Sequence, residues 1–411
     1  MVPLTTVQGF APEALRALLG ARPLYLWGSG DVALDVLTSL RRMGFSPCAF
    51  FDTRVRAGES VQVCGLPCLP TQAVLGSRAV PRPFVVIASA DYRLAAARAC
   101  VDAGFARGRD FIDQFDIPRP VAVVELCAPD GRCMAAAAFE RLLAKLLADQ
   151  PLLCHLELSW QGDPGRHPEL ARLVAYAERF VPCTVNTALH TLDDVQGVLA
   201  AAPTRLNFIV RGHGASYDAA FGVGSWARAQ AALETLRAAE TPDRTGARIM
   251  LRYLRAPEAA SETFSFWQGE VAGSSLRLNI EWPYVTPYDL VLAYCREGVH
   301  PAGEAGQFAA LPWSLETALQ LAASERDQPC LSQRIFPVIG VDGAVAACHL
   351  YRAALLAPDY LACDWSALLA ARRTCVPCQE CQAQGLHRLD IEVQARRHPA
   401  WRVRLLGKAA D

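Results

Sequence analysis

The sequence predicts an α/β protein made of three consecutive units, and two observations support this class. Short apolar runs typical of buried strands alternate with amphipathic segments of helical length over most of the 411 residues. Five of the six cysteines in the last fifth of the chain, Cys330, Cys348, Cys375, Cys378 and Cys381, then indicate a small metal-binding unit after the α/β part. We expect the units to span residues 1–118, 119–320 and 321–411.

The composition is that of an ordinary folded protein. Hydrophobic residues make up 52% of the chain, charged residues make up 20%, and the formal net charge is -1. No apolar run is long enough to cross a bilayer, and the N-terminus lacks the basic and apolar pattern of an export signal. The odd count of 15 cysteines suits a reducing compartment. We therefore expect a cytoplasmic protein that binds neither nucleic acid nor a membrane.

The first unit begins with a strand, a glycine-rich turn, a helix and a second strand. Apolar runs over residues 24–27 and 48–51 predict the strands, and residues 32–43 have the periodicity of a helix. Between the first strand and the helix lies Gly28-Ser29-Gly30-Asp31-Val32-Ala33, which fits the dinucleotide-binding pattern G-x-G-x-x-G/A in its required place. A third strand over residues 84–88 follows. This order predicts a Rossmann-like unit.

The glycine-rich turn is a candidate nucleotide site. Gly28 and Gly30 would let the backbone approach a diphosphate at the helix N-terminus, and Asp52 lies where a ribose-binding carboxylate is expected. The predicted ligand is NAD(P) or a nucleotide sugar. The same glycines also permit close packing of a helix on a strand, so a purely structural turn is the alternative. The segment resembles the N-terminal Rossmann-like domains of bacterial sugar-modifying acyltransferases and polysaccharide-biosynthesis proteins.

The second unit alternates strands and helices again. We expect helices over residues 135–148 and 168–180, and strands over residues 122–126, 154–158, 183–186, 206–210, 248–253 and 276–280. Strands joined by helices imply a parallel barrel or open sheet, in which function gathers at the C-terminal ends of the strands. Polar clusters follow three of the predicted strands, at residues 160–170, 186–188 and 211–214.

The cysteines of the third unit have the spacing of an iron–sulfur site. Cys375, Cys378 and Cys381 place three thiols within seven residues, and Cys330 and Cys348 can complete the four thiolates that a [4Fe–4S] cluster needs. A tight turn predicted between Cys330 and Cys348 would bring these two together. Four thiolates suit structural zinc equally well, and the spacing alone does not select four of the five.

Together, these features resemble the radical S-adenosylmethionine (SAM) enzymes. Gly162-Asp163-Pro164 and His167-Pro168-Glu169-Leu170 stand where that family has a Gly-Glu-Pro-type segment and a His-Pro helix start. The spacing of Cys330, Gly343 and Cys348 fits the opening pattern of the family's SPASM or twitch extension. The resemblance covers residues 119 to about 390. It implies a radical-SAM-like partial β/α barrel followed by a SPASM-like domain with a [4Fe–4S] cluster.

The resemblance assigns Gly162 and Asp163 to S-adenosylmethionine, but the chain departs from the family pattern. The Cys-x3-Cys-x2-Cys motif that holds the reactive cluster is missing, and only Cys127 and Cys133 follow the first predicted barrel strand. Asp163 also replaces a longer glutamate that would hold the methionine amino group, which argues against binding of S-adenosylmethionine. Because two thiols cannot replace three, the radical-generating activity is not expected here.

Two functions of different classes follow. The first is an iron–sulfur binding protein that presents a small-molecule, nucleotide-linked or peptide substrate to a catalytic partner, or accepts electrons from that partner. The second is an enzyme, either a divergent radical SAM enzyme or an NAD(P)-dependent oxidoreductase of sugar or polysaccharide metabolism. The sequence identifies no catalytic acid, base or nucleophile for the second function.

Overall fold

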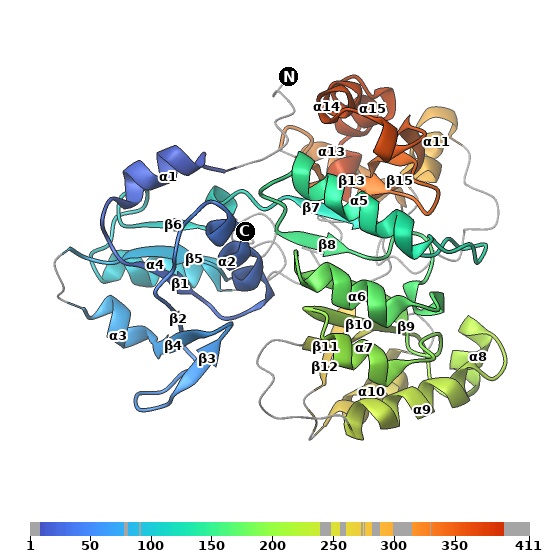
Figure 1. Cartoon of the computed structure of the whole chain (residues 1–411), viewed down its shortest axis with the longest axis horizontal. Coiled ribbons are helices and arrows are strands. Elements are labelled where there is room, and N and C mark those ends of the chain that lie inside the picture. The colour runs from blue at the N-terminus through green and yellow to red at the C-terminus, as the bar shows by residue number, and fades with distance from the viewer. Residues whose placement is uncertain are drawn as a thin grey trace.

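The computed structural model describes residues 9–77, 81–89, 92–238, 248–254, 260–272, 274, 276–281, 288–298, 315–328 and 330–389. Figure 1 shows a smaller N-terminal body beside a larger one. Each body is built around its own sheet, of six strands in the first and nine in the second. Within these ranges no helix has the length and apolar character that a membrane span requires.

The N-terminal sheet has the strand order β3-β4-β2-β1-β5-β6. Its strands are β1 (Leu24–Trp27), β2 (Ala49–Asp52), β3 (Val61–Val63), β4 (Leu66–Pro70), β5 (Phe84–Ile87) and β6 (Phe111–Asp113). β3 runs antiparallel to β4, and the other pairs are parallel. β2 and β5 lie on opposite sides of β1, so the strand order reverses there. The sheet is therefore doubly wound, with its switch point beside β1.

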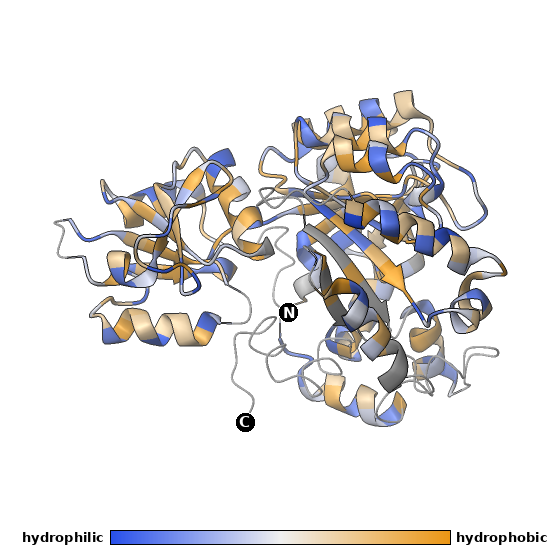
Figure 2. Cartoon of the chain, turned by 90° about the horizontal axis from the view of Figure 1, so that it is seen from below, coloured by the Kyte–Doolittle hydropathy of each residue, from blue (hydrophilic) through white to orange (hydrophobic). Residues whose placement is uncertain are grey.

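Helices and apolar side chains bury both faces of this sheet. The helices are α1 (Pro12–Leu19), α2 (Asp31–Arg42), α3 (Thr71–Leu75) and α4 (Arg93–Asp102). Leu26 and Val86 belong to one apolar cluster, and their neighbours Trp27 and Ile87 belong to another. Successive residues of a strand point to opposite faces, so both faces are apolar. This explains why the strands are continuous apolar runs, which Figure 2 shows as orange strands.

The larger sheet has the order β12-β11-β10-β9-β8-β7-β13-β14-β15. Its first six strands along the chain are β7 (Val121–Val124), β8 (His155–Glu157), β9 (Cys183–Ala188), β10 (Arg205–Val210), β11 (Arg248–Leu254) and β12 (Arg277–Glu281). All of them pair in parallel, and they confirm the six predicted strands. The three remaining strands are β13 (Ile335–Ile339), β14 (Val345–Cys348) and β15 (Tyr351–Ala357).

One face of the parallel strands is covered by helices. These are α5 (Ala136–Asp149), α6 (Leu170–Glu178), α7 (Val195–Ala201), α8 (Ala215–Phe221), α9 (Ser225–Ala238) and α10 (Ala260–Val271). In α5, Phe139, Leu142, Leu143 and Leu146 are buried, a spacing of three and four residues that makes one apolar side of the helix. These side chains join the largest apolar cluster of the protein's described part. Figure 1 shows α5, α6, α7 and α9 lying over the sheet.

Polar side chains alternate with the apolar ones in the middle of the same sheet. The Asn207 amide nitrogen donates to Asn186 Oδ1 at 2.8 Å, and the Asn186 amide nitrogen donates to Ser159 Oγ at 3.1 Å. The adjacent residues Val185 and Leu206 lie in the apolar cluster. Because side chains alternate along a strand, this row of hydrogen-bonded polar side chains lies on the face opposite the helices.

The C-terminal elements extend the larger sheet and add helices beside it. β13 pairs in parallel with β7, and β14 continues antiparallel to it. The helices are α11 (Tyr288–Glu297), α13 (Leu315–Ser324), α14 (Trp365–Arg373) and α15 (Val376–Ala383), with short helices η4 (Leu331–Arg334) and η6 (Leu386–Arg388). The sheet therefore continues across the unit boundary expected between residues 320 and 321.

A buried ion pair joins the two bodies. The Asp35 carboxylate of α2 accepts a hydrogen bond from Arg205 of β10 at 2.7 Å, and His155 Nδ1 lies 3.6 Å from the same oxygen. Arg42, also in α2, donates to the backbone carbonyls of Pro151 and Phe180. Burial raises the pKa of Asp35, but Arg205 and His155 outweigh it and hold that pKa below its usual value. The contact fixes α2 against the edge of the larger sheet where the parallel strands begin.

Candidate metal centre and neighbouring sites

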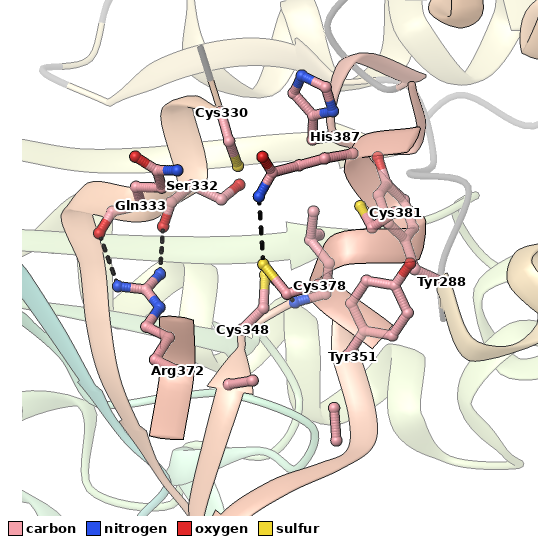
Figure 3. Close-up of a pocket in the computed structure, with 14 residues that line it drawn as sticks. Tyr288, Cys330, Ser332, Gln333, Cys348, Tyr351, Arg372, Cys378, Cys381 and His387 are labelled. Atoms are coloured by element: carbon pink, nitrogen blue, oxygen red, sulfur yellow. Dashed lines mark hydrogen bonds between the residues drawn. The ribbon is translucent and has the colours of Figure 1, made fainter. Parts of the chain in front are cut away.

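Four cysteines from three parts of the C-terminal region line one pocket. Cys330 directly precedes η4, and Cys348 ends β14. Cys378 and Cys381 are three residues apart on α15, a spacing that places both on the same side of the helix. Figure 3 shows these four side chains around the pocket. The structure thus brings together four of the five predicted ligands.

The fifth predicted ligand, Cys375, is in a different position. It is the N-cap residue of α15, and it is absent from the described residues that line the pocket. Burial raises the pKa of Cys375, and the charge of Cys378 raises it further. By contrast, the pKa of Cys381 is raised by the charges of three cysteines, Cys330, Cys348 and Cys378. The pocket is thus lined by four of the five cysteines that the spacing groups together.

Burial favours the protonated form of three thiols in the pocket. Burial raises the pKa of Cys348 to about 12 and also raises the pKa values of Cys330 and Cys381. A thiol must lose its proton to become a metal ligand, so metal binding here would release protons. His349, next to Cys348, has a pKa that burial and Arg334 lower to about 4. Its ring is therefore neutral near pH 7.

Two polar side chains with buried polar atoms line the pocket. Arg372 of α14 is 5% exposed, and its Nε atom is buried with no hydrogen-bond partner in the described part. The Tyr351 hydroxyl is also buried, and its interaction is with the Cys381 thiol. Buried polar atoms are normally hydrogen-bonded, so the Arg372 Nε atom is a buried donor left without a partner on a side chain that lines the pocket. Figure 3 shows both side chains beside the cysteines.

These residues fit a thiolate-ligated cluster in donor chemistry. Four thiols supply the ligands that a [4Fe–4S] cluster takes, and buried Arg372 supplies a cation beside them. Among the described residues no three His, Cys, Asp or Glu side chains already form a group that could hold a single metal ion.

A second group of polar residues lies at the C-terminal end of β7. Glu125 directly follows this strand and is 4% exposed. Its Oε1 accepts hydrogen bonds from the backbone nitrogens of Gln161 and Gly162, both at 3.0 Å, and its Oε2 accepts one from Val341 at 3.4 Å. Glu125 thus ties the loop after β8 to the turn after β13. Glu125 was not predicted from the sequence, although a carboxylate directly after an apolar strand is a usable signal.

The two residues assigned to S-adenosylmethionine by resemblance make internal contacts. A Cβ atom at Gly162 would lie 2.0 Å from the carbonyl oxygen of Cys127, so close packing requires glycine. Asp163 accepts four hydrogen bonds, from the backbone nitrogens of Gly165 and Ala188 and from the hydroxyls of Thr187 and Thr191, at 2.5 to 3.0 Å. Both carboxylate oxygens are therefore in use. The structure thus gives both residues a role in the packing and hydrogen bonding of the loop after β8.

Cys127 and Cys133 form a disulfide with each other. They also pair as an isolated antiparallel bridge, so a short loop closes directly after β7. Cys127 is 1% exposed. The position at which radical SAM enzymes would have three thiols thus has two, and each is bonded to the other.

The glycine-rich turn after β1 lies at the switch point of the N-terminal sheet. Gly28 has φ +106, and a Cβ there would lie 3.1 Å from the carbonyl oxygen of Ala88. Gly30 is the N-cap of α2, and a Cβ there would meet no atom within 4 Å. Gly28 is therefore required by backbone conformation and packing. Gly30 leaves open space at a helix N-terminus.

Asp52 ends β2 as predicted, but its carboxylate is already paired. Arg54 Nε donates to Oδ1 at 3.0 Å, and Ser29 Oγ donates to Oδ2 at 2.8 Å. Burial alone would raise the pKa of Asp52, but the hydrogen bonds from Arg54 and Ser29 hold it well below its usual value. A ribose hydroxyl would have to displace one of these donors. The structure thus places Asp52 at the expected point with its acceptor atoms in use.

Comparison with known proteins gives matches at the level of structure. No family model matches the chain, and no curated protein matches it. Native anSMEcpe with bound AdoMet matches with 9% identity over 71% of this chain and 88% of that chain, at a TM-score of 0.42. Streptococcus suis SuiB bound to S-adenosylmethionine matches with 10% identity over 55% of this chain and 59% of that chain, at a TM-score of 0.33. BtrN in complex with AdoMet and 2-DOIA matches with 12% identity over 56% of this chain and 73% of that chain, at a TM-score of 0.30.

These neighbours are radical SAM or SPASM-type enzymes. At such identities and TM-scores, the likeness assigns neither a family nor an activity to this chain.

Proposed function

We propose that this chain is an iron–sulfur protein whose C-terminal pocket holds one [4Fe–4S] cluster. Its larger sheet would be a radical-SAM-like scaffold that has lost the site for cleaving S-adenosylmethionine. Its role would be to bind a nucleotide-linked or peptide substrate, or a catalytic partner, and to exchange electrons through the cluster. The cluster would supply one-electron chemistry, while the thiols hold it and the surrounding helices exclude water.

The convergence of four cysteines on one pocket carries this proposal. Cys330, Cys348, Cys378 and Cys381 line the pocket although they come from separate elements. Scattered structural thiols would not be expected to gather around a buried cation such as Arg372. The four ligands that a [4Fe–4S] cluster requires match this set in number and type.

The loss of cleavage chemistry is supported by the loop after β7. Cleavage of S-adenosylmethionine in the related family needs a cluster held by three cysteines with one open iron. Here Cys127 and Cys133 are paired with each other, and Asp163 is saturated by internal donors.

A nucleotide-binding role for the N-terminal body is the second candidate. The open space at Gly30, at the switch point of a doubly wound sheet, favours it. Arg54 beside this turn makes a phosphorylated ribose worth testing, because a nearby arginine can accommodate a 2′-phosphate. The enzyme alternatives, a divergent radical SAM enzyme or an NAD(P)-dependent oxidoreductase, would require reactive groups that the described residues do not identify.

The test is anaerobic reconstitution followed by iron and sulfide analysis. We expect about four irons per chain with a broad brown absorbance, and a loss of most of this iron in Cys378→Ser and Cys381→Ser. Cys375→Ser is the matched control, because it alters a cysteine of the same segment outside the pocket, and it should retain the cluster. Stoichiometric zinc without labile sulfide would replace this proposal with a structural zinc site.

A further inference from the structure

Arg372 is a buried cation without a carboxylate partner. It is 5% exposed, and no described acidic side chain forms an ion pair with it. Its Nη1 donates to the backbone carbonyl of Gln333 at 3.0 Å, and its Nη2 lies 3.4 Å from the carbonyl of Ser332. The guanidinium also stacks on the Phe336 ring, 4.3 Å from the ring centre. Burying an unpaired charge is costly, so an anion is expected nearby.

The groups that surround this cation are thiols. Arg372 faces the pocket with Cys330, Cys348 and Cys378, as Figure 3 shows. Its two carbonyl contacts are to the short helix η4, which begins directly after Cys330. Arg372 therefore both holds the segment that carries one ligand and places a positive charge beside the others. Neutral thiols do not balance that charge, whereas ligated thiolates would.

We infer that Arg372 is the fixed countercharge of the cluster held by Cys330, Cys348, Cys378 and Cys381, and that it raises the reduction potential of that cluster. This inference rests on the proposed function. A [4Fe–4S] centre with four thiolates carries net negative charge, and reduction adds one more electron. A cation fixed in a buried site stabilises the more negative state, because the low dielectric strengthens the attraction. Without the cation the cluster should be harder to reduce and less tightly held.

The test compares four variants after anaerobic reconstitution. Arg372→Gln and Arg372→Met remove the charge, Arg372→Lys retains it, and Arg373→Gln removes the adjacent exposed charge as a matched control. The measurements are bound iron and sulfide, and the midpoint potential from a redox titration followed by electron paramagnetic resonance. We expect a lower midpoint potential in both neutral variants, and values close to wild type in Arg372→Lys and Arg373→Gln.

The possible outcomes separate this inference from the proposed function. If the wild-type chain takes up no iron and sulfide, the proposed function fails. If the wild-type chain holds a cluster and both neutral variants keep its potential, the countercharge role is wrong. Folding of the cluster-free neutral variants is expected, since they lose an unpaired buried charge. If neither folds, as judged by circular dichroism, Arg372 belongs to the fold and the inference is overturned.

Discussion

Asp163 is expected to be a structural residue of the larger sheet, and replacing it tests this expectation directly. Its carboxylate joins the loop after β8 to the end of β9 through four accepted hydrogen bonds. Asp163→Ala would leave the backbone nitrogens of Gly165 and Ala188 without partners, at about 1–3 kcal/mol each. Asp163 is partly exposed, so water recovers some of this loss. We expect a net loss of about 2–4 kcal/mol.

The conservative variant gives a graded result. In Asp163→Asn one side-chain oxygen becomes an NH2 group, and Gly165 and Ala188 each donate a backbone N–H to a different oxygen. Either orientation of the amide therefore sets an NH2 group against a backbone N–H. We expect Asp163→Asn to be less stable than wild type by about 1–2 kcal/mol, and so to fall between wild type and Asp163→Ala.

Thermal unfolding followed by circular dichroism measures this effect. A loss of 2–4 kcal/mol should lower the Tm of the larger body by about 5–10 °C. Asp193→Asn is the control, because Asp193 is an exposed carboxylate in the segment after β9. If Asp163→Ala unfolds within 1 °C of the control yet weakens binding of S-adenosylmethionine by about tenfold, the carboxylate is a ligand-binding group and the structural role is refuted.

Three further predictions concern other parts of the chain. Gly30→Leu should lower the Tm only slightly, because its Cβ meets no atom within 4 Å although leucine is a poorer helix N-cap than glycine, but it should abolish any thermal shift caused by NAD, NADP or nucleotide sugars; a retained shift would place the nucleotide elsewhere. The Cys127→Ala, Cys133→Ala double variant should keep its iron, and the reduced wild type should yield no 5′-deoxyadenosine above a cluster-free control; product that vanishes in the variant would indicate a divergent radical enzyme. Asp35→Asn should destabilise the contact between the bodies by about 3 kcal/mol in chemical unfolding at pH 7. The folded pKa of Asp35 lies below its ordinary value. The contribution of Asp35 to the free energy of unfolding is therefore complete above about pH 4 and is lost as the pH falls through the folded pKa. An equal effect of the variant at pH 7 and pH 3 would contradict this.

The cysteine pocket could be predicted in part from sequence. The spacing of Cys378 and Cys381 is a local property, and one helical turn is enough to bring their side chains together. The convergence of Cys330 and Cys348 on the same pocket also follows the expectation. Cys375 is equally close in sequence, but it precedes α15 and does not line the pocket, and the point at which α15 begins could not be read from the spacing.

Long-range contacts explain what could not be predicted. Val341 donates to Glu125 across 216 residues of chain, and Arg372 reaches Gln333 across 39. Hydrophobic periodicity identifies strands such as β7 and β13, but it does not say which strands will pair. Asp52 illustrates the same limit, since its position was predicted while its hydrogen bond from Ser29, 23 residues away, was not.

The pairing of β13 with β7 has a consequence for how the chain can be divided. β7 hydrogen-bonds to β8 on one side and to β13 on the other. A shortened chain that ends before β13 would turn β7 into an exposed edge, with a row of unpaired amides along the apolar residues Val121–Val124. Such an edge is a template for self-association. The cysteine-rich region thus supplies strands of the larger sheet. A chain shortened before β13 would be prone to aggregate.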